Sequence, residues 1–123
     1  MAVAWPDGQG FSAVRAELLA SRDATEAQVH ALDDDLRALF EASRSSNADD
    51  EHDPEGSTIA FERAQLTAVL TAARRRLTEL DVAVQRLDAG TYGVCERCSL
   101  PIPDERLAAR PSARTCVACA SRR

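Results

Sequence analysis

The sequence predicts a mainly α-helical protein, in which a long antiparallel coiled-coil hairpin precedes a small C-terminal module that holds every cysteine of the chain. Apolar residues recur at three- and four-residue steps through two long segments, which is the period of one helix face. The 123 residues include only three Phe, one Trp and one Tyr. We therefore expect no large globular core, since a narrow apolar seam between two helices needs few large side chains.

The first helix is expected at residues 11–44, after an irregular stub at 1–10 that contains two glycines and a proline. Its apolar stripe slips in phase by one residue between Thr25 and Val29, and charged residues lie off the stripe. The stripe, with two weak polar positions, consists of Phe11, Val14, Leu18, Ser21, Thr25, Val29, Leu32, Leu36 and Leu39.

The second helix is expected at residues 57–88, with a regular heptad seam that Gly90 would end as a C-cap. The seam consists of Leu66, Leu70, Ala73, Leu77, Leu80, Val84 and Leu87. Each helix would be about 50 Å long at 1.5 Å per residue. Two seams of equal length joined by a short polar connection predict an antiparallel hairpin over residues 11–89, with a parallel coil between two chains as the alternative.

Residues 45–56 connect the helices and form an acidic tip with five carboxylates and no basic residue. A solvated turn is the plain interpretation, because Asp53 suits an N-cap and Pro54 suits the first helical position, with Ser57 or Thr58 as later caps. The functional interpretation is that a stiff hairpin carries the carboxylates into a partner, where they meet Mg²⁺, basic groups or a mobile loop.

The four cysteines form two pairs with C-x2-C spacing, separated by seventeen residues, and are Cys95, Cys98, Cys116 and Cys119. Four thiolates at this spacing complete a tetrahedral site for one zinc ion, with iron as the alternative metal. Because sulfur fills every position, we expect a structural ion and not a catalytic one. Two disulfides would need a secreted chain, and no signal peptide is evident; a redox C-x-x-C would need a βαβ context that is lacking.

The module at residues 90–123 has little apolar material of its own. Ile102 and Leu107 are the large apolar residues deep in the loop between the cysteine pairs, and we expect them to form a small core beside the metal. Three arginines are candidates for docking on a partner, namely Arg97, Arg106 and Arg110. The last two could instead cap turns or pair with Asp104 and Glu105.

Charge is unevenly distributed along the chain. The net charge is −5, with segment sums of −4 for residues 1–44, −5 for 45–56, +1 for 57–89 and +3 for 90–123. This asymmetry argues against a protein that binds nucleic acid along its whole length. All fifteen basic residues are Arg, which is typical of high-GC bacterial coding, and no apolar run is long enough for a membrane span. We expect a cytoplasmic protein.

The string Gly-Thr-Tyr-Gly-x-Cys-Glu-x-Cys-x3-Ile-x3-Arg-Leu-x2-Arg-Pro-x4-Cys-x2-Cys, which begins at Gly90, resembles the DksA/TraR family of bacterial transcription factors. The matching positions are Cys95, Glu96, Cys98, Ile102, Arg106, Arg110, Pro111, Cys116 and Cys119. Over the rest of the chain the resemblance lies in the hairpin pattern and not in individual residues.

The resemblance implies a regulator that binds RNA polymerase without contacting a promoter sequence and inserts its hairpin through the secondary channel. It implies that Asp50 and Asp53 act at the tip, since they match the aspartates of the family pattern Asp-x-x-Asp-x-Ala, where Glu55 replaces the alanine. It also implies docking of the zinc module and the adjacent helix ends on the enzyme's surface. We expect a monomer without sequence-specific DNA binding.

Two other classes of function fit parts of the sequence. A zinc ribbon that binds nucleic acid would contact phosphates through the basic residues of 97–123. Tyr92 is the one aromatic residue of the module at 90–123 that could stack on a base, which weighs against this function. A coiled-coil adaptor would combine a structural zinc with an inert tip. An enzyme is disfavoured, because a metal saturated by sulfur offers no open coordination position.

Overall fold

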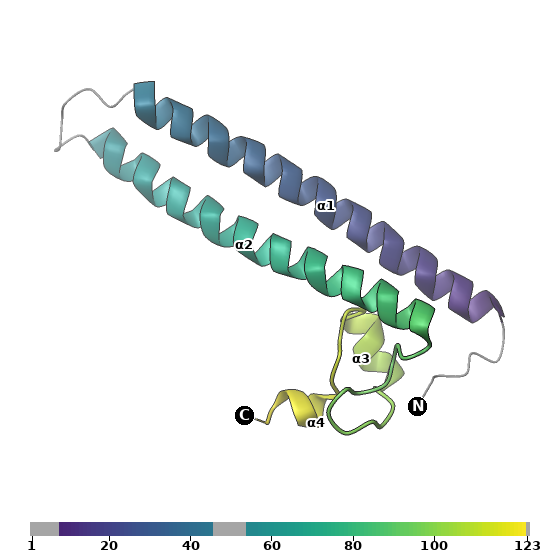
Figure 1. Ribbon diagram of the computed structural model, residues 1–123. Helices are drawn as coiled ribbons and strands as arrows, with labels where there is room; N and C mark the ends of the chain where they lie inside the picture. Colours follow the sequence, from purple (N-terminus) through teal and green to yellow (C-terminus); the bar gives the residue numbers. More distant parts are fainter. Residues whose placement is uncertain (1–7, 46–53, 123) are drawn as a thin grey trace. The chain divides into compact units, whose positions relative to one another are not determined.

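The computed structural model describes residues 8–45 and 54–122, which contain four helices (Figure 1). The helices are α1 (Gly8–Ser45), α2 (Pro54–Ala89), α3 (Asp104–Ala109) and α4 (Val117–Ala120). The described part of the chain has no strand, only an isolated antiparallel bridge between Val94 and Pro101. The predicted mainly α fold is confirmed. Among the described helices, none combines the length and apolarity that crossing a membrane requires.

The long helices extend slightly beyond their predicted ends. The second helix begins at Pro54, whose missing N–H costs nothing in the first turn. This is the first helical position that the sequence suggested for Pro54, and it lies before the approximate start at residue 57. Its C-terminus is closed as predicted by Gly90, which adopts a left-handed φ of 81°. The Thr91 N–H then donates to the carbonyl of Arg86 at 2.8 Å. The predicted cap Asp53 lies outside the described residues.

The chain divides into two compact units. Among the described residues, the first, which we call the base unit, comprises 8–23 and 77–122, and the second, the distal unit, comprises 24–45 and 54–76. Each unit pairs a segment of α1 with a segment of α2, which run antiparallel side by side (Figure 1). The separate predicted division into a stub, a hairpin and a zinc module remains a prediction.

The base unit has a core that joins the two long helices to the start of the module. Its buried members are Leu18, Leu80, Ala83, Leu87 and Tyr92, and Phe11, Val14, Val84 and Leu107 pack against them. Ion pairs from α1 to α2 flank this core, with Arg15 Nε 3.0 Å from an Asp88 oxygen and a second pair between Arg22 and Asp81. Opposite charges across the seam therefore help to align the helices.

The distal unit has a seam of its own between its segments of α1 and α2. Leu70, Ala73 and Thr25 are buried, while the remaining seam positions are half-buried. The half-buried positions are Val29, Leu32, Leu36, Leu39 and Leu66. An Asp33 oxygen lies 3.4 Å from Arg74 Nη2, which helps to set the antiparallel register of the pair. Every predicted seam position is thus buried or half-buried, including those on either side of the phase slip.

Replacing a leucine by alanine should cost more stability at a buried seam position than at an exposed position outside the seam. We expect Leu80→Ala to lower the free energy of unfolding by about 2–5 kcal/mol, because Leu80 is only 2% exposed and its loss leaves a cavity. The matched control is Leu100→Ala, at a position 64% exposed, with an expected loss of about 0.5 kcal/mol or less. Urea unfolding followed by circular dichroism measures both, and equal losses would contradict the burial described for the base unit.

Candidate metal centre

Two short turns of the base unit carry the four cysteines. In the first turn, the Cys95 N–H donates to the Leu100 carbonyl at 2.8 Å and the Ser99 N–H donates to the Cys95 carbonyl at 2.9 Å. Ser99 has a left-handed φ of 62°, which tightens the turn directly after Cys98. In the second turn, Cys116 is the N-cap of α4. These bonds curve each C-x2-C segment around its sulfur atoms.

The four sulfur atoms converge on one point. All of them lie within 4.8 Å of one another, and Cys98 Sγ is 3.9 Å from Cys116 Sγ. A tetrahedron with zinc–sulfur bonds of about 2.3 Å has edges of about 3.8 Å, which matches this separation. A disulfide requires about 2.05 Å, and none joins these cysteines. The donor set and its spacing therefore fit a single tetrahedral zinc ion.

The predicted small core beside the metal is present. Ile102 is 3% exposed and clusters with Cys95 and Cys119, and Leu107 packs against them. Leu107 also packs against the core of the two long helices. One leucine of α3 therefore connects the environment of the sulfur atoms to the hairpin within the base unit.

The close packing of the four thiols lowers the pKa of some of them and raises that of others. Burial opposes ionisation of Cys95, but backbone hydrogen bonds from Cys98, Cys116 and Arg97 outweigh it and lower the pKa of Cys95 to about 6. Cys119 shows the opposite effect, since its hydrogen bond to Cys116 and its burial raise its pKa to about 12. Without a metal, some thiols thus retain the protons that stabilise neighbouring thiolates. The four sulfur atoms would hold a cation in place of these protons, so metal binding would release protons.

The three candidate docking arginines make contacts inside the base unit. Arg97 Nη1 donates to the Cys119 carbonyl at 2.9 Å, and Arg106 Nε donates to the Thr115 carbonyl at 2.7 Å. Both bonds tie the second cysteine pair to the preceding part of the module. Arg110 Nη2 lies 3.5 Å from a carboxylate oxygen of Glu79 on α2.

The alternative pairing of Arg106 and Arg110 with Asp104 and Glu105 is not found among the described contacts. Sequence reasoning missed the structural bonds of Arg97 and Arg106, because their acceptors are carbonyl groups that any residue could supply. Docking by these arginines remains a prediction. The tip residues Asp50 and Asp53 lie outside the described residues, so their predicted role likewise remains a prediction.

The fold and the site define a class of protein, a helical hairpin that carries a four-cysteine structural zinc module. Residues 90–123 match the prokaryotic dksA/traR C4-type zinc finger, so this module is similar to the zinc finger of the DksA/TraR family. This match and the four convergent sulfur atoms confirm the prediction of one structural zinc ion.

Solved and curated relatives show the extent of the similarity. The fold resembles that of transcription factor DksA2 from Pseudomonas aeruginosa, with a TM-score of 0.75 and 24% identity over 93% of this chain and 82% of that one. General stress protein 16O of Bacillus subtilis (strain 168) is 39% identical over 77 residues, or 63% of this chain and 47% of the relative. An uncharacterized protein of Aquifex aeolicus (strain VF5) is 50% identical over 44 residues, or 36% of this chain and 30% of the relative. The chain thus spans less than half the length of these two curated relatives.

Metal content provides a direct test of the site. We expect the purified chain to hold about one zinc per molecule, and Cys95→Ser to lose most of it, because three thiolates and a poorly ionised hydroxyl bind zinc far more weakly. Val117→Ala, at a side chain that is 57% exposed, is the control that leaves all four sulfur atoms in place. Elemental analysis after dialysis measures the zinc, and full retention by Cys95→Ser would contradict a four-sulfur site.

The affinity for zinc should depend on pH with a definite sign. A proton competes with the metal for each thiolate, so affinity should fall as the pH falls through about 6, the pKa of Cys95, and should already decline above it because Cys119 holds its proton more tightly. Competition with a chromophoric chelator over a pH series measures this. An affinity that is constant across the series, after correction for the chelator's own protonation, would contradict metal binding by thiolates.

Proposed function

We propose that this protein is a bacterial, cytoplasmic regulator that binds RNA polymerase through the secondary channel and modulates initiation without recognising a promoter sequence. The observation that carries the proposal is the combination of a DksA/TraR zinc finger at residues 90–123 with a hairpin fold like that of the transcription factor DksA2. A similarity in fold alone would support the proposal less strongly, because helical hairpins occur in proteins with many different functions.

The acidic tip is the part proposed to act on the polymerase. Asp50 and Asp53 would enter the channel, where carboxylates can bias mobile catalytic elements or perturb the coordination of Mg²⁺ and so change the lifetime of promoter complexes. Glu55 adds a further negative charge where the family pattern has alanine. Repulsion among carboxylates in the channel would therefore differ from that in members with the alanine.

The zinc module is proposed to dock on the outside of the enzyme. Zinc, when bound, supplies a rigid fourfold cross-link and no reactive position. Among the three candidate arginines, Arg110 is the most available, since its side chain is 60% exposed and its contact with Glu79 is long. Arg97 and Arg106 would act mainly by holding the docking surface in shape through their bonds to backbone carbonyls.

A zinc ribbon that binds nucleic acid receives less support. Tyr92, the aromatic residue that would stack on a base, is 4% exposed and donates its hydroxyl hydrogen to the Pro111 carbonyl at 2.8 Å. Stacking needs an accessible aromatic face. The surface charges of the module are also partly paired, as in the 3.1 Å contact between Arg114 Nε and Glu96. A coiled-coil adaptor would have the same fold as the proposed regulator. Binding to a partner other than RNA polymerase would distinguish it.

The tip mechanism predicts that binding and activity separate. We expect the double variant Asp50→Ala/Asp53→Ala to bind core RNA polymerase with an affinity within about threefold of that of the unaltered chain. It should lose most of its effect on transcription in vitro, because the proposal assigns that effect to the tip carboxylates and the binding to the base. Pull-down on core polymerase followed by a transcription assay measures the two properties.

The control for this experiment is Asp49→Ala, which removes one carboxylate from the same segment without altering the two matched aspartates. Full transcriptional activity of the double variant would contradict the tip mechanism. Loss of activity in Asp49→Ala alone would show that the assignment of the tip residues is displaced along the sequence. Strong, salt-dependent binding of the chain to naked DNA would favour the nucleic-acid alternative.

A further inference from the structure

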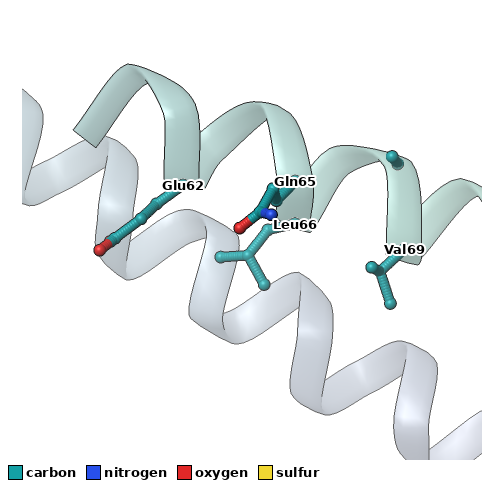
Figure 2. Close-up of a pocket in the computed structure, with 5 residues that line it drawn as sticks. Glu62, Gln65, Leu66 and Val69 are labelled. Atoms are coloured by element: carbon teal, nitrogen blue, oxygen red, sulfur yellow. The ribbon is translucent and has the colours of Figure 1, made fainter. Parts of the chain in front are cut away.

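Among the described residues, the four cysteines are the one group of side chains that could hold a metal ion. The apolar groove on α2 in Figure 2, for comparison, offers a metal only Glu62 and Gln65 beside Leu66, Ala68 and Val69. The residues that determine zinc affinity beyond the ligands themselves therefore lie around the sulfur atoms, where ligands are held in place by their neighbours.

The second cysteine pair is held at both ends by arginine side chains from earlier in the module. Arg106 Nε donates to the carbonyl of Thr115, the residue directly before the pair, at 2.7 Å. Arg97 Nη1 donates to the carbonyl of Cys119, the last residue of the pair, at 2.9 Å, and to the carbonyl of Arg122 at 3.2 Å. Two guanidinium groups therefore fix where the second pair begins and ends.

Arg97 contacts both cysteine pairs. It lies between Cys95 and Cys98 in the sequence, so its backbone belongs to the first pair while its side chain holds the second. Its backbone N–H also donates to the Cys95 thiol. The pairs are seventeen residues apart in the sequence, yet all four sulfur atoms lie within 4.8 Å of one another. A residue that joins the pairs reduces the conformational entropy that is lost when a metal brings them together.

The positive charge of Arg97 also favours the metal-bound form. Four thiolates carry more negative charge than one Zn²⁺ neutralises, and burial makes this excess costly. Cys95 is 1% exposed and Cys119 is 4% exposed. The bond from Arg97 to the Cys119 carbonyl is partly buried, so solvent screens the guanidinium less than it would a group on the open surface. A guanidinium remains protonated at any ordinary pH, and it therefore provides a permanent compensating charge.

We propose that Arg97 is a positioning residue for zinc, which holds the second cysteine pair in its ligating arrangement and offsets part of the negative charge of the four thiolates. Arg106 supports the same pair from its other end. Removal of groups that support metal ligands typically lowers metal affinity by about 10- to 100-fold. The inference does not depend on binding to RNA polymerase, because it concerns the metal site alone.

The first experiment measures the zinc affinity of the full chain by competition with a chromophoric chelator at one pH. Arg97→Met, which loses the charge and the donors, should bind zinc about tenfold or more weakly. Arg97→Lys should stay within about threefold of the unaltered chain, because one ammonium nitrogen can donate to both carbonyls as Nη1 does. Arg122→Met is the matched control, since it removes one charge from an exposed side chain and keeps the backbone carbonyl that Arg97 contacts. It should change the affinity less than about twofold.

The second experiment replaces zinc by Co²⁺, whose visible absorption reports the geometry of its ligands. Arg97→Met should keep the charge-transfer bands of cobalt bound to four thiolates, but its d–d bands should shift relative to those of the unaltered chain. Arg97→Lys should restore the original bands. Circular dichroism checks that the metal-loaded variants have the same helix content. If Arg97→Met does not fold, Arg97→Gln, which keeps a polar side chain, provides the same comparison.

Three results would overturn the proposal. The first is a zinc affinity of Arg97→Met equal to that of the unaltered chain. The second is an equal loss of affinity in Arg122→Met, because net charge and not the position of Arg97 would then be the cause. The third is a loss in Arg97→Lys as large as that in Arg97→Met, which would show that a cation at this position does not hold the second pair.

Discussion

The convergence of four sulfur atoms within 4.8 Å is the constraint on which the base unit depends. The module between residues 90 and 122 has few apolar side chains, and Ile102 is the one large aliphatic residue in its buried cluster. A segment of this size cannot fold on hydrophobic burial alone, because the entropy of ordering its backbone is too large. Zinc binding must therefore supply much of its folding free energy, as in other small metal-dependent modules.

A few contacts connect the cysteine cluster to the two long helices of the base unit. Leu107 packs against both the cysteine cluster and the core of the long helices. Arg86, in the last turn of α2, donates to the carbonyls of Thr91 and Val94, which fixes the chain as it leaves the helix. Tyr92 and the pair between Arg110 and Glu79 complete the connection. Under the proposed function, the zinc module orients the base for docking, while the groups that act on the polymerase belong to the tip.

The sequence predicted the helices, their seams and the metal ligands because these are set by local spacing. Heptad steps identified seam positions that are all buried or half-buried, and two C-x2-C pairs identified the ligands without any tertiary information. The structural bonds of Arg97 and Arg106 could not be predicted, since they depend on backbone carbonyls brought close only by folding around the sulfur atoms.

Entry of the hairpin into the secondary channel of RNA polymerase is the central element of the proposed function. A cryo-electron microscopy structure of the full chain bound to core polymerase tests it most directly. We expect helical density within the channel, with the segment that contains Asp50 and Asp53 facing the active site and the zinc module outside. Density for the chain only on another surface of the enzyme, or contacts made only with nucleic acid, would contradict the proposal.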